Sequence, residues 1–355
     1  MVRRTTPIDD TLRAHAARVH SEAIVIDGMC TDHIPHPHSK LRFNEPYLRR
    51  LFDGGITAFD QGGAGARSFK DAVKLVRQWE HRVAHTADQA IFVRRADDIR
   101  RAKAERKVGV IIGSQDPAMI EDDTDYIEPL YRMGVRTLQV TYNERSLLGD
   151  GCQERVQGGL TDFGIAAIEE MNRVGLLVDV SHAGEATALE ATQVSRAPVI
   201  ISHSACRALR NNPRSASDEL IRAMAKTGGV IGICLLPFLL TEDGRAEATL
   251  DDLLRHVDHV VDLVGVDHVG FGSDLTEEID PAEMMTETGE LGQMVNRPYK
   301  APVYPPLPWI FPQEANSLAK WGNLTLALLA RGYADHDVAK VMGGNWLRVY
   351  SEVWK

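Results

Sequence analysis

Two histidines stand at the ends of consecutive apolar segments of this sequence. His182 ends "LLVDVSH" (176–182), and His203 lies in "PVIISHS" (198–204). If both segments are parallel strands of one sheet, the two imidazoles meet at its carboxyl edge. Neutral imidazoles on adjacent strands form half of a typical transition-metal site. A lone histidine is as often a satisfied core residue, but the pair favours a ligand role.

Other polar residues that suit such a site also follow apolar segments. Asp274 ends "HVGFGSD" (268–274), where a carboxylate can bind a metal or carry a proton, although capping a helix is the alternative. Gln115 can offer its amide oxygen to a metal or a substrate. Tyr142 and Asn143 can donate to a polarised carbonyl or a carboxylate. Structural hydrogen bonding explains the last three residues equally well.

Two arginines lie close behind the second histidine. Arg207 and Arg210 are one helical turn apart in "RALRNNP" (207–213). A planar guanidinium is the usual receptor for a substrate carboxylate. An ordinary surface salt bridge is the alternative reading of each.

The segments that carry these residues belong to a longer series. Eight apolar segments recur along the chain: 23–28, 55–61, 108–115, 137–143, 176–182, 198–204, 229–237 and 268–274. Apolar residues at nearly every position indicate strands buried on both faces, as in a parallel sheet covered by helices. Helical patterns lie between them, such as the apolar stripe from Leu250 to Val264. The alternation predicts an α/β fold, a (β/α)8 TIM-type barrel.

The main competing fold is an open, doubly wound sheet, whose phosphate-binding GxGxxG after the first strand is absent. We therefore expect one barrel domain over residues 1–355. A charged helical insertion is expected at about 62–107. A long loop at about 275–314 is a candidate lid or dimer arm.

Composition narrows the class of partner. The net charge of −10 argues against nucleic acid and anionic membranes, so a small-molecule substrate is the default. The four widely spaced cysteines fit reduced thiols, and no secretory signal or membrane-spanning run is present. We expect a cytoplasmic protein.

The region around the two histidines resembles the membrane (renal) dipeptidase family of metallopeptidases. The likeness rests on "VDVSHAGEATALEATQVSRAPVIISHSACRALRNNPR" (178–214), with both histidines, the spacing between them and the Arg-Asn that follows. It extends to "AIVIDG" (23–28), "GLTDFG" and the closing "GGNWLRVY" (343–350). It therefore covers almost the whole chain.

The resemblance implies an amidohydrolase-like (β/α)8 metallohydrolase. Members typically carry two zinc ions bridged by a glutamate and cleave dipeptides, related amides and sometimes β-lactams. By the resemblance, His182 and His203 would hold one metal, Asp274 would handle protons and Arg210 would receive the substrate carboxylate.

This sequence departs from the family at the other metal. The His-x-Asp of the first strand reads Met29-x-Thr31, the bridging glutamate reads Gln115, and a substrate-binding histidine reads Tyr142. A thioether, a hydroxyl and an uncharged amide replace imidazole and carboxylate poorly. We therefore expect a single zinc ion at His182 and His203, assisted by Gln115.

Some alternatives stay open. Four nearby residues could replace the missing ligands: Asp32, His33, His36 and His38. The thiol of Cys30 could serve as a soft ligand, but one such thiol is more often inert. The chain could also be another hydrolase, a lyase or a decarboxylase acting on a small carboxylated metabolite, or a binder without catalysis.

Overall fold

The computed structural model describes residues 6–30, 43–62, 66–244, 247–275, 303–305 and 309–355. Within these ranges, one parallel sheet runs in the order β1-β2-β4-β5-β6-β7-β8-β9, and β3 pairs with β4. The strands are β1 (Ile26–Asp27), β2 (Ala58–Asp60), β3 (Ala90–Phe92), β4 (Val108–Ser114), β5 (Val135–Gln139), β6 (Leu177–Asp179), β7 (Val199–Ser204), β8 (Ile231–Ile233) and β9 (Val269–Phe271).

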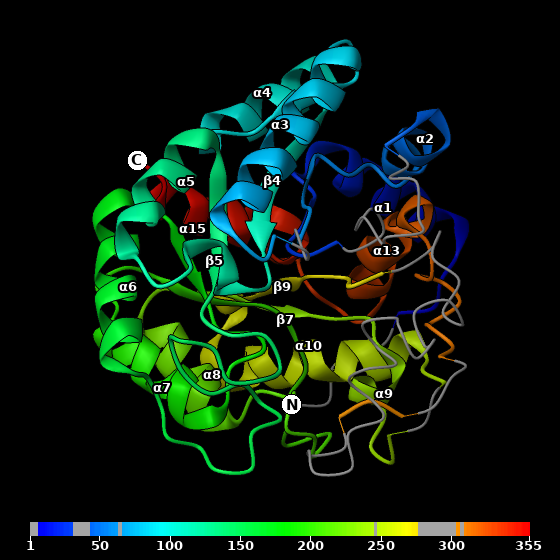
Figure 1. Ribbon diagram of the computed structural model, residues 1–355. Coiled ribbons are helices and arrows are strands. Elements are labelled where there is room, and N and C mark those ends of the chain that lie inside the picture. The colour runs from blue at the N-terminus through cyan, green and yellow to red at the C-terminus, as the bar shows by residue number, and fades with distance from the viewer. Residues whose placement is uncertain (1–5, 31–42, 63–65, 245–246, 276–302, 306–308) are drawn as a thin grey trace.

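Helices surround this sheet (Figure 1). They are α1 (Asp10–Glu22), α2 (Glu45–Asp53), α3 (Phe69–His85), α4 (Ala96–Glu105), α5 (Ile127–Met133), α6 (Asp162–Val174), α7 (Glu185–Val194), α8 (Asp218–Lys226), α9 (Pro237–Leu240), α10 (Leu250–Val264), α13 (Gly322–Ala330), α14 (Asp335–Ala339) and α15 (Asn345–Val353). No helix of the described residues is long and apolar enough to cross a membrane.

The sheet curves round until its two ends meet. Gly28 N donates to Phe271 O at 3.0 Å, and Asp274 N donates to Met29 O at 3.0 Å. These bonds join the end of β9 to the end of β1 across the seam. The result is a nearly closed barrel of parallel strands, which confirms the predicted (β/α)8 fold and all eight predicted strand segments.

One strand was not predicted. The region 62–107 contains helices α3 and α4 and also β3, which lies parallel to the first half of β4. Its apolar run "AIFV" (90–93) is short and sits between charged helical sequences, so the helical pattern hides it. The single-domain division of the chain stays a prediction, and most of the loop at 275–314 lies outside the described residues.

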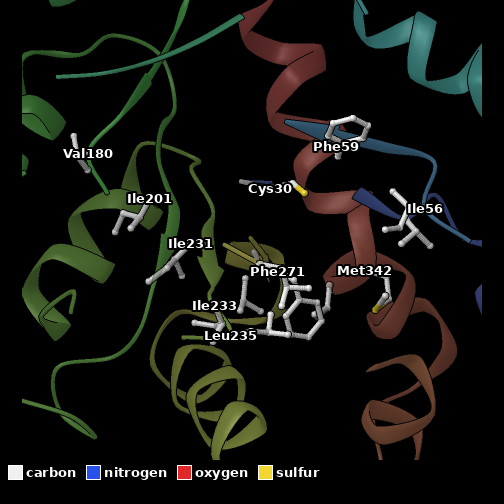
Figure 2. Close-up of a cluster of buried hydrophobic side chains, with 14 of the residues drawn as sticks. Cys30, Ile56, Phe59, Val180, Ile201, Ile231, Ile233, Leu235, Phe271 and Met342 are labelled. Carbon is white, nitrogen blue, oxygen red and sulfur yellow. The ribbon is translucent and has the colours of Figure 1, made fainter. Parts of the chain in front are cut away.

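The helices bury the stripe that their sequences predict. In α10, Thr249 caps the first turn by accepting from Asp252 N at 3.2 Å, and Asp252 accepts from Thr249 N in return at 2.9 Å. Leu253, Val257 and Val260 of α10 are fully buried. They join the outer cluster between helices and strands, of which Figure 2 shows part.

A second apolar cluster lies at the amino ends of the strands. Ile26 and Leu177 pack there against Trp346 and other residues of α15. The indole Nε1 of Trp346 donates to Phe271 O at 3.0 Å, and its ring leaves so little room that a Cβ at Gly28 would lie 2.4 Å from it. Helix α15 therefore forms the floor of the barrel. His182 and His203 lie at the opposite end, where the strands end.

Replacing Trp346 with alanine tests this floor. Because the side chain is fully buried, Trp346→Ala should lower the free energy of unfolding by about 3–5 kcal/mol, measured by urea denaturation. Val156→Ala, at a residue that is 71% exposed, should change it by less than about 0.5 kcal/mol. Equal effects would show that α15 is not a structural floor.

Candidate functional site

The two predicted histidines meet at the carboxyl end of the barrel. His182 lies three residues after β6 and His203 lies within β7, and both are buried. Their Nε2 atoms are 2.9 Å apart, and their ring centroids are 4.9 Å apart. The pairing of β6 with β7 thus brings together the two side chains that the sequence singled out.

Each imidazole is held from behind at its Nδ1. His182 Nδ1 lies 2.8 Å from Asn143 Oδ1, and His203 Nδ1 lies 2.7 Å from Ser202 Oγ. The amide of Asn143 is itself oriented, because its Nδ2 donates to Tyr304 Oη at 3.0 Å. Asn143 Oδ1 therefore accepts, so His182 Nδ1 carries the proton and His182 Nε2 is left with a lone pair.

Tyr142 lies against one of these two histidines. Its ring stacks on the imidazole of His182, with centroids 4.2 Å apart and planes inclined by 25°. Tyr142 and Asn143, both predicted from the end of one strand segment, therefore contact the same histidine. Their catalytic and substrate-binding roles stay predictions.

Arg214 is a residue that the sequence analysis missed. Its buried guanidinium donates from Nη1 to Ser181 O and from Nη2 to His203 O, the latter at 2.7 Å. It thereby ties the end of β6 to β7 beside both histidines. Several arginines follow His203 in the sequence, and no pattern among them indicates which one points inward.

The surroundings keep the histidine pair neutral. Burial, followed by the positive charge of Arg214, holds the pKa of both His182 and His203 well below the usual value. A neutral imidazole with a free lone pair is the form that binds a metal ion. Within the described residues, no group of three or more His, Cys, Asp or Glu side chains could hold a metal ion, and the metal role of these two histidines stays a prediction.

Buried carboxylates turn the chain at three strand ends. Asp27, Asp60 and Asp179 each accept from the backbone N–H two residues further on, at 3.2, 3.1 and 3.0 Å. Such turns end a strand and aim the next residues at the mouth. Burial raises the pKa of Asp27 and of Asp60 to about 7, and it raises that of Asp179.

Met29, the thioether that the sequence places after the first strand, lies at the end of β1. A Cβ on Gly62 would lie 2.5 Å from Met29 Sδ and 3.3 Å from Gln115 Nε2, so these two side chains flank the same point between β1, β2 and β4. Met29 is buried, and so is Gln115. Thr31 and the candidate replacement ligands at 32–38 lie outside the described residues.

Asp274 and Arg210 occupy other parts of the mouth. Asp274 follows β9 with a φ of 53°, a left-handed conformation. Burial raises the pKa of Tyr304, and the charge of Asp274 adds to this effect. Arg210 is half-buried, and its Nε donates to Phe238 O at 3.1 Å. The metal role of Gln115, the proton-carrying role of Asp274 and the carboxylate-binding role of Arg210 stay predictions.

Comparisons with known proteins identify the family of this chain. Residues 13–287 match the model of the membrane dipeptidase family, peptidase family M19. Dipeptidase verJ of Clonostachys rogersoniana is 29% identical over 269 residues, covering 75% of this chain and 61% of that protein. Dipeptidase tcpJ of Claviceps purpurea (strain 20.1) is 27% identical over 288 residues, covering 81% and 60%. The chain thus spans about three fifths of the length of both relatives.

A solved structure extends the likeness to the whole fold. An amidohydrolase from Pseudomonas aeruginosa is 32% identical, covers 96% of this chain and 99% of its own, and superposes with a TM-score of 0.85.

The raised pKa of Asp60 predicts a pH-dependent effect of Asp60→Asn. Asp60 ionises near 3.8 when unfolded and near 7 when folded, so between these values the folded state holds the extra proton. Ionisation therefore costs the wild type stability as the pH rises from about 4 to 7. Urea denaturation should show Asp60→Asn gaining on the wild type by up to about 1.4 kcal/mol per pH unit. A difference that does not vary with pH would contradict the raised pKa.

Proposed function

The chain belongs to the membrane dipeptidase family, and we propose that it hydrolyses a dipeptide or a related small amide with one zinc ion at His182 and His203. The observation that carries this proposal is the buried, neutral pair of imidazoles whose Nε2 atoms face each other at 2.9 Å. The dipeptidase names of the two curated relatives support the substrate class.

The donor set fits one zinc ion. Both Nδ1 atoms are engaged from behind, so the two Nε2 atoms are the nitrogens left to face a ligand. Imidazole nitrogen is a preferred zinc donor. A second ion fits poorly, because the buried Met29 and Gln115 bring no charge to the place where the family resemblance implies further ligands. We therefore keep the proposal of a single zinc.

The chain's own residues have distinct parts in this proposal. A bound zinc ion would supply an activated water and polarise the scissile carbonyl. Asp274 would move the proton from that water to the leaving amine. Tyr142, stacked on His182, would donate its hydroxyl to the developing oxyanion, and Asn143 would hold His182 and a polar group of the substrate.

Arg214 and Arg210 have different parts in the recognition of an anionic substrate. Arg214 is buried against backbone carbonyls beside the histidines, where it contributes a positive potential that favours an anionic group at the mouth. Arg210 is half-buried near the rim and remains the proposed receptor for the substrate carboxylate.

The setting of the activity is also a proposal. The substrate is a small molecule, not a nucleic acid or a membrane, and a homodimer is one candidate assembly. All four cysteines are buried thiols, which supports a reducing compartment such as the cytoplasm.

Metal analysis and a ligand variant test the central claim. The purified full chain should hold one zinc equivalent by elemental analysis and should hydrolyse unblocked dipeptides. His203→Ala should lose the zinc and reduce kcat/KM by on the order of 100-fold or more, because an activating ligand is removed. The control is His268→Ala: His268 lies just before β9 and bonds Gly229 O at 2.9 Å, away from the mouth.

Three results would contradict this proposal. Two tightly bound equivalents would overturn the single zinc. Unchanged hydrolysis in His203→Ala would remove the metal role of the pair. A zinc-loaded chain that cleaves neither dipeptides nor their amides would favour the alternatives, a reaction on another small carboxylated metabolite or binding alone.

Arg210→Gln tests the recognition of the carboxylate. Losing one charge-assisted contact should raise KM for a free dipeptide about tenfold or more and leave KM for the corresponding C-terminal amide unchanged. Steady-state kinetics on the two substrates provide the measurement, with the exposed Arg222→Gln of α8 as the control. An equal change for both substrates would assign Arg210 a structural role.

A further inference from the structure

Ser202 lies between a buried carboxylate and one of the two histidines. Its Oγ is 2.5 Å from Asp179 Oδ2 and 2.7 Å from His203 Nδ1. All three residues are fully buried. The three groups thus form a line that starts inside the barrel and ends at the imidazole.

The direction of the hydrogen bonds along this line follows from Asp179. Its Oδ1 accepts from Ser181 N at 3.0 Å, from Ser181 Oγ at 2.8 Å and from Ser202 N at 3.0 Å. The remaining oxygen, Oδ2, faces Ser202 Oγ. A carboxylate surrounded by donors acts as an acceptor throughout, so the single hydroxyl proton of Ser202 points at Asp179.

Ser202 then presents only a lone pair to the ring of His203. In the metal-binding state, His203 Nδ1 therefore carries the proton, and the lone pair of the neutral imidazole lies on Nε2. This is the nitrogen that faces His182 at 2.9 Å. The tautomer that presents Nε2 to a metal is thus selected by a carboxylate that never contacts the imidazole.

The two histidines differ in how they are anchored. His182 bonds directly to a neutral amide, Asn143 Oδ1, whereas His203 is backed by a carboxylate through a hydroxyl. Partners behind a ligating histidine fix its ring orientation and increase its basicity, and a charged partner does so more strongly. The anchoring therefore makes His203 the stronger metal ligand of the two histidines.

We propose that Ser202, backed by Asp179, is a positioning residue that fixes the tautomer and the ring orientation of His203 for metal binding. The inference rests on the proposed function, since it takes the histidine pair as the metal site. Ser202 itself contacts neither the metal nor the substrate in this account.

The first test removes the hydroxyl. Ser202→Ala in the full chain should weaken zinc binding by about 10–100-fold, measured by competition with a chromogenic chelator. The visible absorption of the Co²⁺-substituted chain should also change, because the ring of His203 is no longer held. Ser204→Ala is the matched control: Ser204 lies in the same strand, is equally buried, and bonds Arg214 O at 2.9 Å instead of Asp179.

The second test reverses the direction of the hydrogen bonds between residue 179, Ser202 and His203. In Asp179→Asn, an amide Nδ2 placed at the former Oδ2 donates to Ser202, whose proton then points at His203 Nδ1 and selects the wrong tautomer. The new amide keeps an Oδ1 for the donors of Ser181 and Ser202, so zinc binding should fall at least as far as in Ser202→Ala while circular dichroism stays native. This variant decides the matter if Ser202→Ala does not fold.

The outcomes separate this inference from the proposed function. A wild-type chain that binds no zinc would refute the proposed function. Wild-type affinity and an unchanged Co²⁺ spectrum in both Ser202→Ala and Asp179→Asn would overturn the inference alone. An equal loss in Ser204→Ala would also overturn it, because the effect would then be general to the strand.

Discussion

Two buried imidazoles whose Nε2 atoms face each other inside a protein create a constraint that the surrounding structure must satisfy. His182 and His203 approach to 2.9 Å between their Nε2 atoms, with no room for solvent to separate them. Without a metal ion, one Nε2 must donate a proton to the other, and a bound zinc ion would take the place of that proton. The parallel pairing of β6 with β7 creates the contact, and Arg214 holds the two strand ends together around it.

The sequence predicted the scaffold well because the strands of a covered barrel are apolar at almost every position. It also located His182 and His203, because the carboxyl ends of the strands of a barrel all lie at the same end of the barrel. It did not reveal β3, whose short apolar run lies between helices. Nor did it single out Arg214 or the Ser202–Asp179 contact, because these depend on which side chains turn inward after each strand ends.

The same reasoning explains why the sequence could describe the altered half of the mouth only in part. Met29 and Gln115 are visible as substitutions in the sequence, and the structure places them around one point beside Gly62. The two side chains differ in charge from the ligands that the family resemblance implies. A thioether and an amide are both uncharged, so they cannot balance the charge of a second cation. Among the described residues, the two side chains beside Gly62 at this strand end are thus uncharged.

The barrel floor has a consequence for how the protein is made. Trp346 and Tyr350 of α15 pack under strands as early in the chain as β1, yet every described strand precedes α15 in the sequence. During synthesis, the ribosome therefore releases the whole set of strands before the helix that seals them. The nascent barrel must wait with its lower apolar layer uncovered until residues 345–353 have left the ribosome, and during that time the exposed apolar surface favours aggregation.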